Sequence, residues 1–318
     1  MQRLLGCALA ATLLAGGATA AFAEWPERPI QIVVPYGAGG GSDATVRLFQ
    51  RVIEEEELLP QPLAVINIPG AGGRTGSRRV VEADPDGYTI LSNHLTLLSS
   101  EASGLADFGH KDYEPVASTG GVCFVAIVPE SAPYETLADL LDDAAERPGE
   151  IVFGANLGAM NHLGGLLLQD AQEGASFRFV QIGGDAANYT AVAGGTTQAS
   201  VISTGQYKAS GGRGIKALGL LAEDRHPEMP DVPTAMEQDV EAQFCYDYWW
   251  LAPAGTPSEA VETMADALEA AMESERVQEA FRERAYTDVF RRGESFKEFI
   301  AQEYERIAPV AVRATQAQ

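Results

Sequence analysis

The sequence predicts an α/β fold built of two domains, and three observations lead to this prediction. Short β-rich apolar runs alternate with segments whose apolar residues recur at helical spacing. Glycines mark the connections between them, as at Gly37 and Gly39–Gly41 or Gly183–Gly184. The chain has 318 residues, more than one typical hydrophobic core accommodates. Alternation of this kind predicts mainly parallel sheets with helices on both faces.

The first 23 residues have the pattern of an export signal. Arg3 precedes an apolar run from Leu4 to Ala15, and a stretch of small residues ends with Ala21-Phe22-Ala23. This order of charge, apolar core and A-x-A site is typical of a secretory signal peptide. The run is too short for a permanent membrane span, which needs about 20 residues. We therefore predict cleavage after Ala23 and an exported, periplasmic protein.

The elements that follow begin with strand–helix units. The first helix is predicted to end near Glu57, because Val46, Phe49 and Val52 recur at helical spacing before it. The turn Pro85-Asp86-Gly87 leads into the third strand. The predicted strands of this part are residues 29–34, 63–68 and 88–91.

The middle of the chain continues the alternation, and its end is helical. The predicted strands are residues 122–128, 151–154, 177–181 and 199–202, with a last strand at 249–252. The predicted helices are residues 137–145, a helix from about Asn161, and residues 186–193. Two final helices are expected to start at Thr256-Pro257-Ser258-Glu259 and Ser295-Phe296-Lys297-Glu298, because both segments fit a capping box.

The charge of the chain excludes one class of partner and constrains another. There are 22 basic and 45 acidic residues, a formal net charge of −23. Nucleic acid needs a basic surface, so nucleic-acid binding is excluded. The overall field also repels small anions. An anion site in this chain must therefore be made attractive locally.

The segment Tyr36-Gly37-Ala38-Gly39-Gly40-Gly41-Ser42-Asp43 offers such a site between a predicted strand and helix. Glycines allow the backbone to approach a ligand, and a helix N-terminus attracts negative charge. A tight turn with Ser42 or Asp43 as helix cap is the plain alternative. A loose dinucleotide fingerprint is a third reading, but the second predicted strand ends Ile66-Asn67-Ile68 without the acid that a nicotinamide cofactor requires. We predict no cofactor.

Two further glycine-containing turns suggest the same chemistry. One is residues 154–162, and the other is Gly183-Gly184-Asp185. Ligands of open α/β sheets bind at the carboxyl ends of the strands, so turns of this kind suit a cleft between two domains. Catalytic signals are poor, because the four histidines are scattered without a metal-binding pair or a nucleophile turn. We predict no metal and no enzymatic activity.

Five motifs occur in an order that identifies a family. They are residues 35–43, Asn67-Ile68-Pro69-Gly70-Ala71-Gly72-Gly73, Pro85-Asp86-Gly87-Tyr88-Thr89-Ile90-Leu91, Asp231-Val232-Pro233-Thr234 and Leu251-Ala252-Pro253-Ala254-Gly255-Thr256-Pro257. With them the chain resembles the Bug-type solute-binding proteins of tripartite tricarboxylate transporters over essentially its whole mature length.

The resemblance implies the type II periplasmic-binding-protein fold, with two doubly wound α/β domains joined by a two-crossing hinge. Residues 24–122 plus 229–318 would form the first domain and residues 123–228 the second. A small organic acid, such as a di- or tricarboxylate, would bind between them. The implied contacts are Tyr36, Ala38, Gly39, Gly40, Ser42, Asn93, His94, Asn156, Gly158, Asn161, His162, Gly184, Asp185, Ser203 and Thr204.

The implied partners are the carboxylate and the membrane subunits of a transporter, with the binding protein itself a monomer. A binding module of a sensor system and an exported hydrolase are the alternative functions. Cys123 and Cys245 each lie near a predicted crossing between the domains. A disulfide at the hinge and two buried free thiols are both open readings of this pair.

Overall fold

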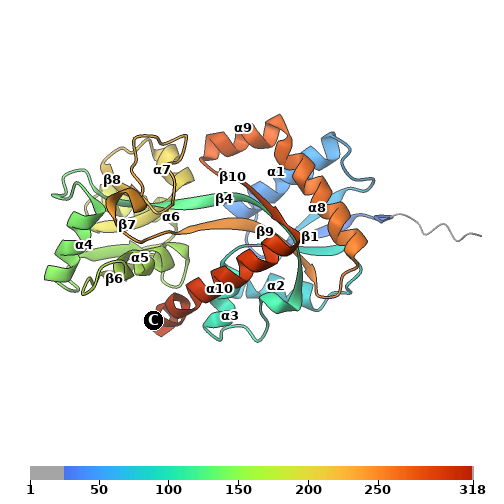
Figure 1. Ribbon diagram of the computed structural model, residues 1–318, viewed down its shortest axis with the longest axis horizontal. Helices are drawn as coiled ribbons and strands as arrows, with labels where there is room; N and C mark the ends of the chain where they lie inside the picture. The colour runs from blue at the N-terminus through green and yellow to red at the C-terminus, as the bar shows by residue number, and fades with distance from the viewer. Residues whose placement is uncertain (1–24, 317–318) are drawn as a thin grey trace, which may run out of the picture.

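The computed structural model describes residues 25–316 as two α/β halves joined by long strands (Figure 1). The predicted signal peptide lies outside the described residues. The strands are β1 Ile30–Val34, β2 Leu63–Asn67, β3 Thr89–Asn93, β4 Tyr113–Pro129, β5 Val152–Ala155, β6 Arg178–Gln181, β7 Ala199–Ser203, β8 Ile215–Leu220, β9 Cys245–Pro253 and β10 Thr287–Arg292. The helices are α1 Gly41–Glu55, α2 Arg74–Val81, α3 Thr96–Ala102, α4 Leu137–Glu146, α5 Met160–Asp170, α6 Asp185–Ala193, α7 Thr204–Ser210, α8 Ser258–Glu273, α9 Glu275–Arg284 and α10 Gly293–Gln316.

Strand β4 passes from one half to the other. Its residues up to Cys123 pair with β9 and β10, beside the group β2-β1-β3. From Phe124 onward it pairs with β7 and β8, beside the group β5-β6. The chain returns at β9, where Cys245 lies opposite Cys123. The two crossings between the halves are therefore neighbours in one sheet.

The prediction of mainly parallel sheets is wrong for the strands that join the halves. β1 pairs in parallel with β2 and β3, and β5 with β6 and β7. Every pairing of β4, and the pairing of β3 with β9, is antiparallel. β4 and β9 carry the chain between the halves in opposite directions, so they pair antiparallel with each other. The result is a mixed sheet, and the α/β class itself is confirmed.

Several element boundaries also differ from the predicted ones. β8, β10, α3 and α7 were absent from the prediction, and the C-terminal region holds α8, α9 and α10 instead of two helices. α8 begins at Ser258 without a side-chain cap, and α10 begins at Gly293, ahead of the predicted capping box. These errors lie outside the three glycine turns, although α7 begins at Thr204, one of the predicted contacts.

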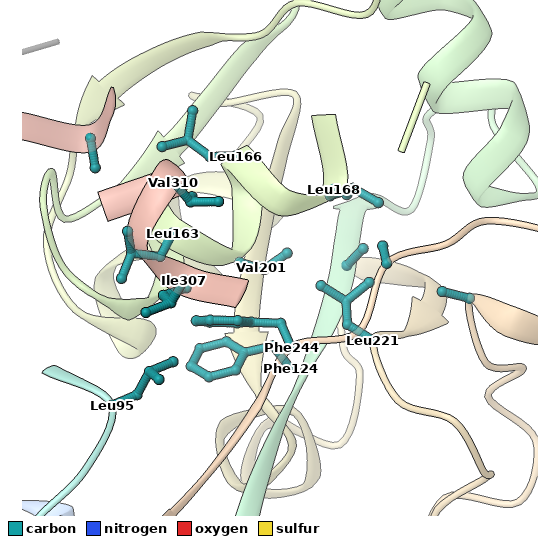
Figure 2. Packing of buried hydrophobic residues seen from close by; sticks show 14 of the residues in the cluster. Leu95, Phe124, Leu163, Leu166, Leu168, Val201, Leu221, Phe244, Ile307 and Val310 are labelled. Atoms are coloured by element: carbon teal, nitrogen blue, oxygen red, sulfur yellow. The ribbon is translucent and has the colours of Figure 1, made fainter. Parts of the chain in front are cut away.

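Helix α10 belongs to the core of both halves. Ile307 and Val310 on this helix contact the α5 leucines Leu163 and Leu166 in one buried cluster (Figure 2). Phe124 and Phe244, one from each crossing, lie in the same cluster with ring centroids 4.9 Å apart. The helix thus spans the junction on one face of the crossing strands.

The division into domains at residues 123 and 228 stays a prediction. Residues after 228 run beside β8, because Thr234 bridges to Leu220 and the Ala235 amide donates to the Leu220 carbonyl. Among the described residues no helix is both long enough and apolar enough to cross a membrane.

Candidate ligand-binding site

The first glycine turn is exposed, and hydrogen bonds to the buried Asp43 fix its conformation. Residues Gly37–Gly41 are solvent-exposed, whereas Asp43 is buried. The Asp43 carboxylate accepts hydrogen bonds from the Gly39 amide at 2.8 Å, from Asn67 Nδ2 at 2.9 Å and from Arg47 Nε at 3.0 Å. Asn67 Nδ2 also donates to the Tyr36 carbonyl at 3.1 Å. This network fixes the shape of the turn.

The N-terminus of α1 is open above this network. Gly40 is its N-cap residue and no side chain caps the helix. The Gly39 amide already donates to Asp43, whereas the first-turn amides of α1, such as those of Gly41 and Ser42, have no partner within the helix. Arg47 neutralises the charge of Asp43, which keeps the helix end attractive to an anion.

Tyr36, Asn93 and His94 form one group at the ends of β1 and β3. The Tyr36 hydroxyl donates to Asn93 Oδ1 at 2.8 Å, and the rings of Tyr36 and His94 stack with centroids 5.2 Å apart. Burial lowers the pKa of His94 to about 4, so its imidazole is uncharged at neutral pH. His94 therefore packs against Tyr36 as an uncharged ring and adds no positive charge at the ends of β1 and β3.

In the other half, side chains of α5 hold the second turn. Asn161 Oδ1 accepts from the Asn156 amide, and His162 Nδ1 accepts from the Gly158 amide, both at 3.0 Å. Asn161 Nδ2 also donates to the Gly183 carbonyl at 3.4 Å, which links the second turn to the third. His162 is fully buried, and burial lowers its pKa.

The third turn continues into α6 and meets β7. Gly184 is the N-cap residue of α6, with no side-chain cap and open space around it. The carboxylate of Asp185 accepts from the Ser203 amide at 3.0 Å. Thr204 Oγ1 donates to the Ala285 carbonyl at 2.7 Å, a bond from one half to the other. The structure thus brings the predicted residues of the second half together beside a contact with the first.

Tyrosines that the sequence prediction missed lie between these groups. The tyrosine cluster consists of Tyr36, Tyr246, Tyr248 and Tyr286. His94 lies 4.7 Å from Tyr246 between ring centroids, Tyr246 lies 5.8 Å from Tyr248, and Tyr248 lies 5.9 Å from Tyr286. Tyr246 and Tyr248 alternate along β9, which places both on one face. The two-residue spacing of Tyr246 and Tyr248 was the only sequence signal that placed these two tyrosines side by side.

The cluster also touches the first glycine turn. A Cβ at Gly41 would lie 3.4 Å from the Tyr248 hydroxyl oxygen and 3.8 Å from that of Tyr286. The two hydroxyls are 3.2 Å apart. The tyrosine cluster therefore lies between the Gly37–Gly41 turn and the hydrogen bond that joins Thr204 to Ala285.

Cys123 and Cys245 form a disulfide at the crossing of β4 and β9. Both cysteines border a cavity of about 360 Å³, together with Asp247, Arg291 and Arg306. None of the predicted ligand contacts lines this cavity. Within residues 25–316 no three or more His, Cys, Asp or Glu side chains gather as a metal site.

Comparisons with known proteins identify the family of the chain. A family model described as "Tripartite tricarboxylate transporter family receptor", TctC, matches residues 48–314. Protein BugT of Bordetella pertussis is 31% identical over 301 residues, covering 92% of this chain and 90% of BugT. A crystal structure of a TctC solute-binding protein from Polaromonas is 27% identical with a TM-score of 0.79, over 90% of this chain and 98% of that one. MatC from Rhodopseudomonas palustris with bound malate is 25% identical with a TM-score of 0.75, over 90% of this chain and all of MatC (100%). The chain therefore belongs to the TctC, or Bug-type, family of periplasmic solute-binding proteins, which are binding proteins and not enzymes.

Proposed function

We propose that this protein captures a small carboxylate, such as a di- or tricarboxylate, in a cleft between its two halves and delivers it to the membrane subunits of a tripartite tricarboxylate-type transporter. In this proposal residues 24–122 plus 229–318 form one domain and residues 123–228 the other. The protein works as a periplasmic monomer after cleavage behind Ala23.

One observation carries the proposal. The exposed turn Gly37–Gly41 leads into a helix without a side-chain cap, and it touches tyrosines at the junction with the other half. Outward-facing amides at a helix N-terminus bind carboxylates without a basic side chain. This suits a chain of net charge −23, in which the long-range field gives an anion no help.

Three further findings support the proposal. Asn156, Asn161 and Gly184 belong to turns of the second half that are joined by hydrogen bonds. The malate bound to MatC supports a hydroxy- or dicarboxylate of similar size as the ligand class. The family assignment supports delivery to a transporter.

A thermal-shift screen of carboxylates, amino acids and aromatic acids tests the ligand class. A ligand that binds only the folded state stabilises it by about 2.7 kcal/mol at a hundredfold excess over its dissociation constant. We expect shifts from small carboxylates. Shifts from sugars or cations, with none from any anion, would overturn the proposal.

A charge-placement experiment tests the turn itself. Ser42→Asp puts a negative charge in the first turn of α1, where it favours the helix by about 0.3–1 kcal/mol but repels a bound carboxylate. Ser258→Asp makes the same change in the first turn of α8, away from the glycine turns. We expect Ser42→Asp to weaken malate binding by about tenfold or more, a change of about 1.4 kcal/mol, and Ser258→Asp to leave binding unchanged. Equal malate affinities of the two variants would show that the Gly37–Gly41 turn does not contact the ligand.

A further inference from the structure

The cavity of about 360 Å³ beside the disulfide, which we call the rear cavity, is enclosed by three parts of the chain. They are the strands β9 and β10, the helix α10, and the segment 222–227 that follows β8. Cys245 and Asp247 of β9 belong to its wall. Phe299 and Glu303 of α10 belong to it as well, one helical turn apart. The proposed function gives none of these side chains a role.

The rear cavity and the tyrosine cluster lie on opposite faces of β9. Side chains alternate between the two faces of a strand. Cys245 and Asp247 line the rear cavity. Tyr246 and Tyr248 point to the other face, where Tyr248 lies next to the Gly37–Gly41 turn. One face of this crossing strand is therefore directed to the proposed ligand cleft, and the other to the rear cavity.

The walls of the rear cavity belong to both halves. β10 pairs with residues 117–121 of β4, in the first half. The segment 222–227 follows β8, whose Leu220 pairs with Val125 of β4, in the second half. Between the two walls β4 and β9 run side by side from one half to the other (Figure 1). A rotation of the halves about these strands therefore changes the distance between the walls.

The disulfide restricts the kind of rotation. Cys123 and Cys245 are bonded at the point where β4 changes its partner strands. A covalent bond at that point opposes sliding of β4 past β9, so the movement that remains is a bending of both strands together. Bending toward the tyrosine cluster brings the halves together on that face and moves the walls of the rear cavity apart. Bending the other way does the reverse.

We propose that the rear cavity controls the balance between the open and closed states of the protein. It widens when the halves close over the ligand and narrows when they open. The ion pair of Asp247 and Arg291 gives it polar walls, and a polar cavity can hold water that leaves as the walls approach. A bulky group that fills the rear cavity then favours the closed state without touching the ligand. This inference rests on the proposed function, because the cleft is assigned to the face of the tyrosine cluster.

Large side chains placed in the walls test the proposal by isothermal titration calorimetry. Val289→Trp fills the rear cavity from β10, and Ala222→Trp fills it from the second half. Val312→Trp, at an exposed position of α10, is the matched control. Apparent affinity rises with the fraction of protein in the binding-competent state, so we expect both wall variants to bind L-malate and succinate about threefold more tightly or better. The factor should be equal for the two acids, because neither substitution contacts them, and the control should bind as the wild type does.

Small-angle X-ray scattering of the ligand-free proteins measures closure directly. We expect the two wall variants to have a smaller radius of gyration than the wild type and Val312→Trp. Circular dichroism checks that each variant is folded, and Val289→Phe, with a smaller side chain, replaces a tryptophan variant that is not.

The outcomes separate this inference from the proposed function. An unchanged or larger radius of gyration in the folded wall variants overturns the inference. So does an unchanged or weaker affinity, when the wild type binds malate or succinate, and carboxylate capture then stands. If no carboxylate binds any of the proteins but the radius still falls, the proposed ligand class fails and the rear cavity keeps its role in closure.

Discussion

At the residue scale, two buried aspartates have opposite pKa shifts because their partners differ. Asp43 is 3% exposed and Asp247 is 5% exposed. Burial alone would raise the pKa of Asp43, but hydrogen bonds from Gly39, Arg47 and Asn67 lower it. Burial raises the pKa of Asp247 to about 6, although Arg291 and Ser118 oppose the rise. The pKa of Asp43 is thus lowered where its carboxylate shapes the glycine turn, whereas Asp247 can titrate near the disulfide between β4 and β9.

Asp247 should make folding less favourable as the pH rises. Its pKa is higher in the folded protein than the ordinary 3.8, so the folded state binds the proton more tightly and its stabilisation is lost as the pH rises from about 4 through about 6. A difference of about two pKa units corresponds to roughly 3 kcal/mol as an upper value. Urea unfolding of the wild type and of Asp247→Asn between pH 4 and 7 measures this, and the variant should gain relative stability as the pH rises. A difference in unfolding free energy that stays constant with pH would contradict the assignment.

At the element scale, α10 stabilises the junction of the halves through its buried face. Val310 is 3% exposed in the cluster with α5, whereas Val312 on the same helix is 38% exposed. Val310→Ala should lower the free energy of unfolding by about 2 kcal/mol, because two buried methyl groups are lost and a small cavity remains. Val312→Ala carries the same change in helix propensity and should cost less than about 0.5 kcal/mol. Equal losses by urea denaturation would show that the contacts of α10 with α5 contribute little.

The length of β4 shows where sequence patterns mislead. The prediction placed a strand at residues 122–128 only, and the sequence before it contains Pro115 and the pair Gly120–Gly121, which are unfavourable inside strands. The strand runs from Tyr113 to Pro129 and accommodates them at register shifts opposite β9. β10 was missed because its sequence TDVFRR is half-buried and lacks a continuous apolar run. Elements with a clear apolar period, such as β1 and α1, were predicted close to their observed bounds.

The disulfide between β4 and β9 gives a direct chemical prediction. Cys123 and Cys245 are bonded, so the unfolded, unreduced mature protein should contain no titratable thiol, and reduction should release both. Reduction should also lower the free energy of unfolding by about 2–4 kcal/mol, because the bond closes a long loop. The reduced sample is the control for complete labelling. Two thiols in the unreduced sample would show that the cysteines are free in solution.

At the scale of the whole molecule, the site combines segments that are far apart in the chain. The glycine turns could be predicted because each lies between a strand and a helix that follow one another in sequence. The tyrosine cluster could not, because Tyr36, Tyr246 and Tyr286 come from separate segments that meet only when β4 and β9 join the halves. Local sequence patterns thus specified the glycine turns, and the long-range topology specified which side chains surround them.

The net charge of −23 opposes the arrival of any anion, and this has a measurable consequence. Salt shortens the range of the repulsion from about 30 Å at 0.01 M to about 8 Å at 0.15 M, while the backbone amides act only at contact. The association rate of malate, followed by stopped-flow protein fluorescence, should therefore rise by roughly twofold or more across this range. Sodium and potassium chloride at matched ionic strength are the control, because screening depends on ionic strength and not on the identity of the cation. A malate rate that falls with added salt would mean that a positive local field reaches beyond the site and outweighs the charge of the whole protein.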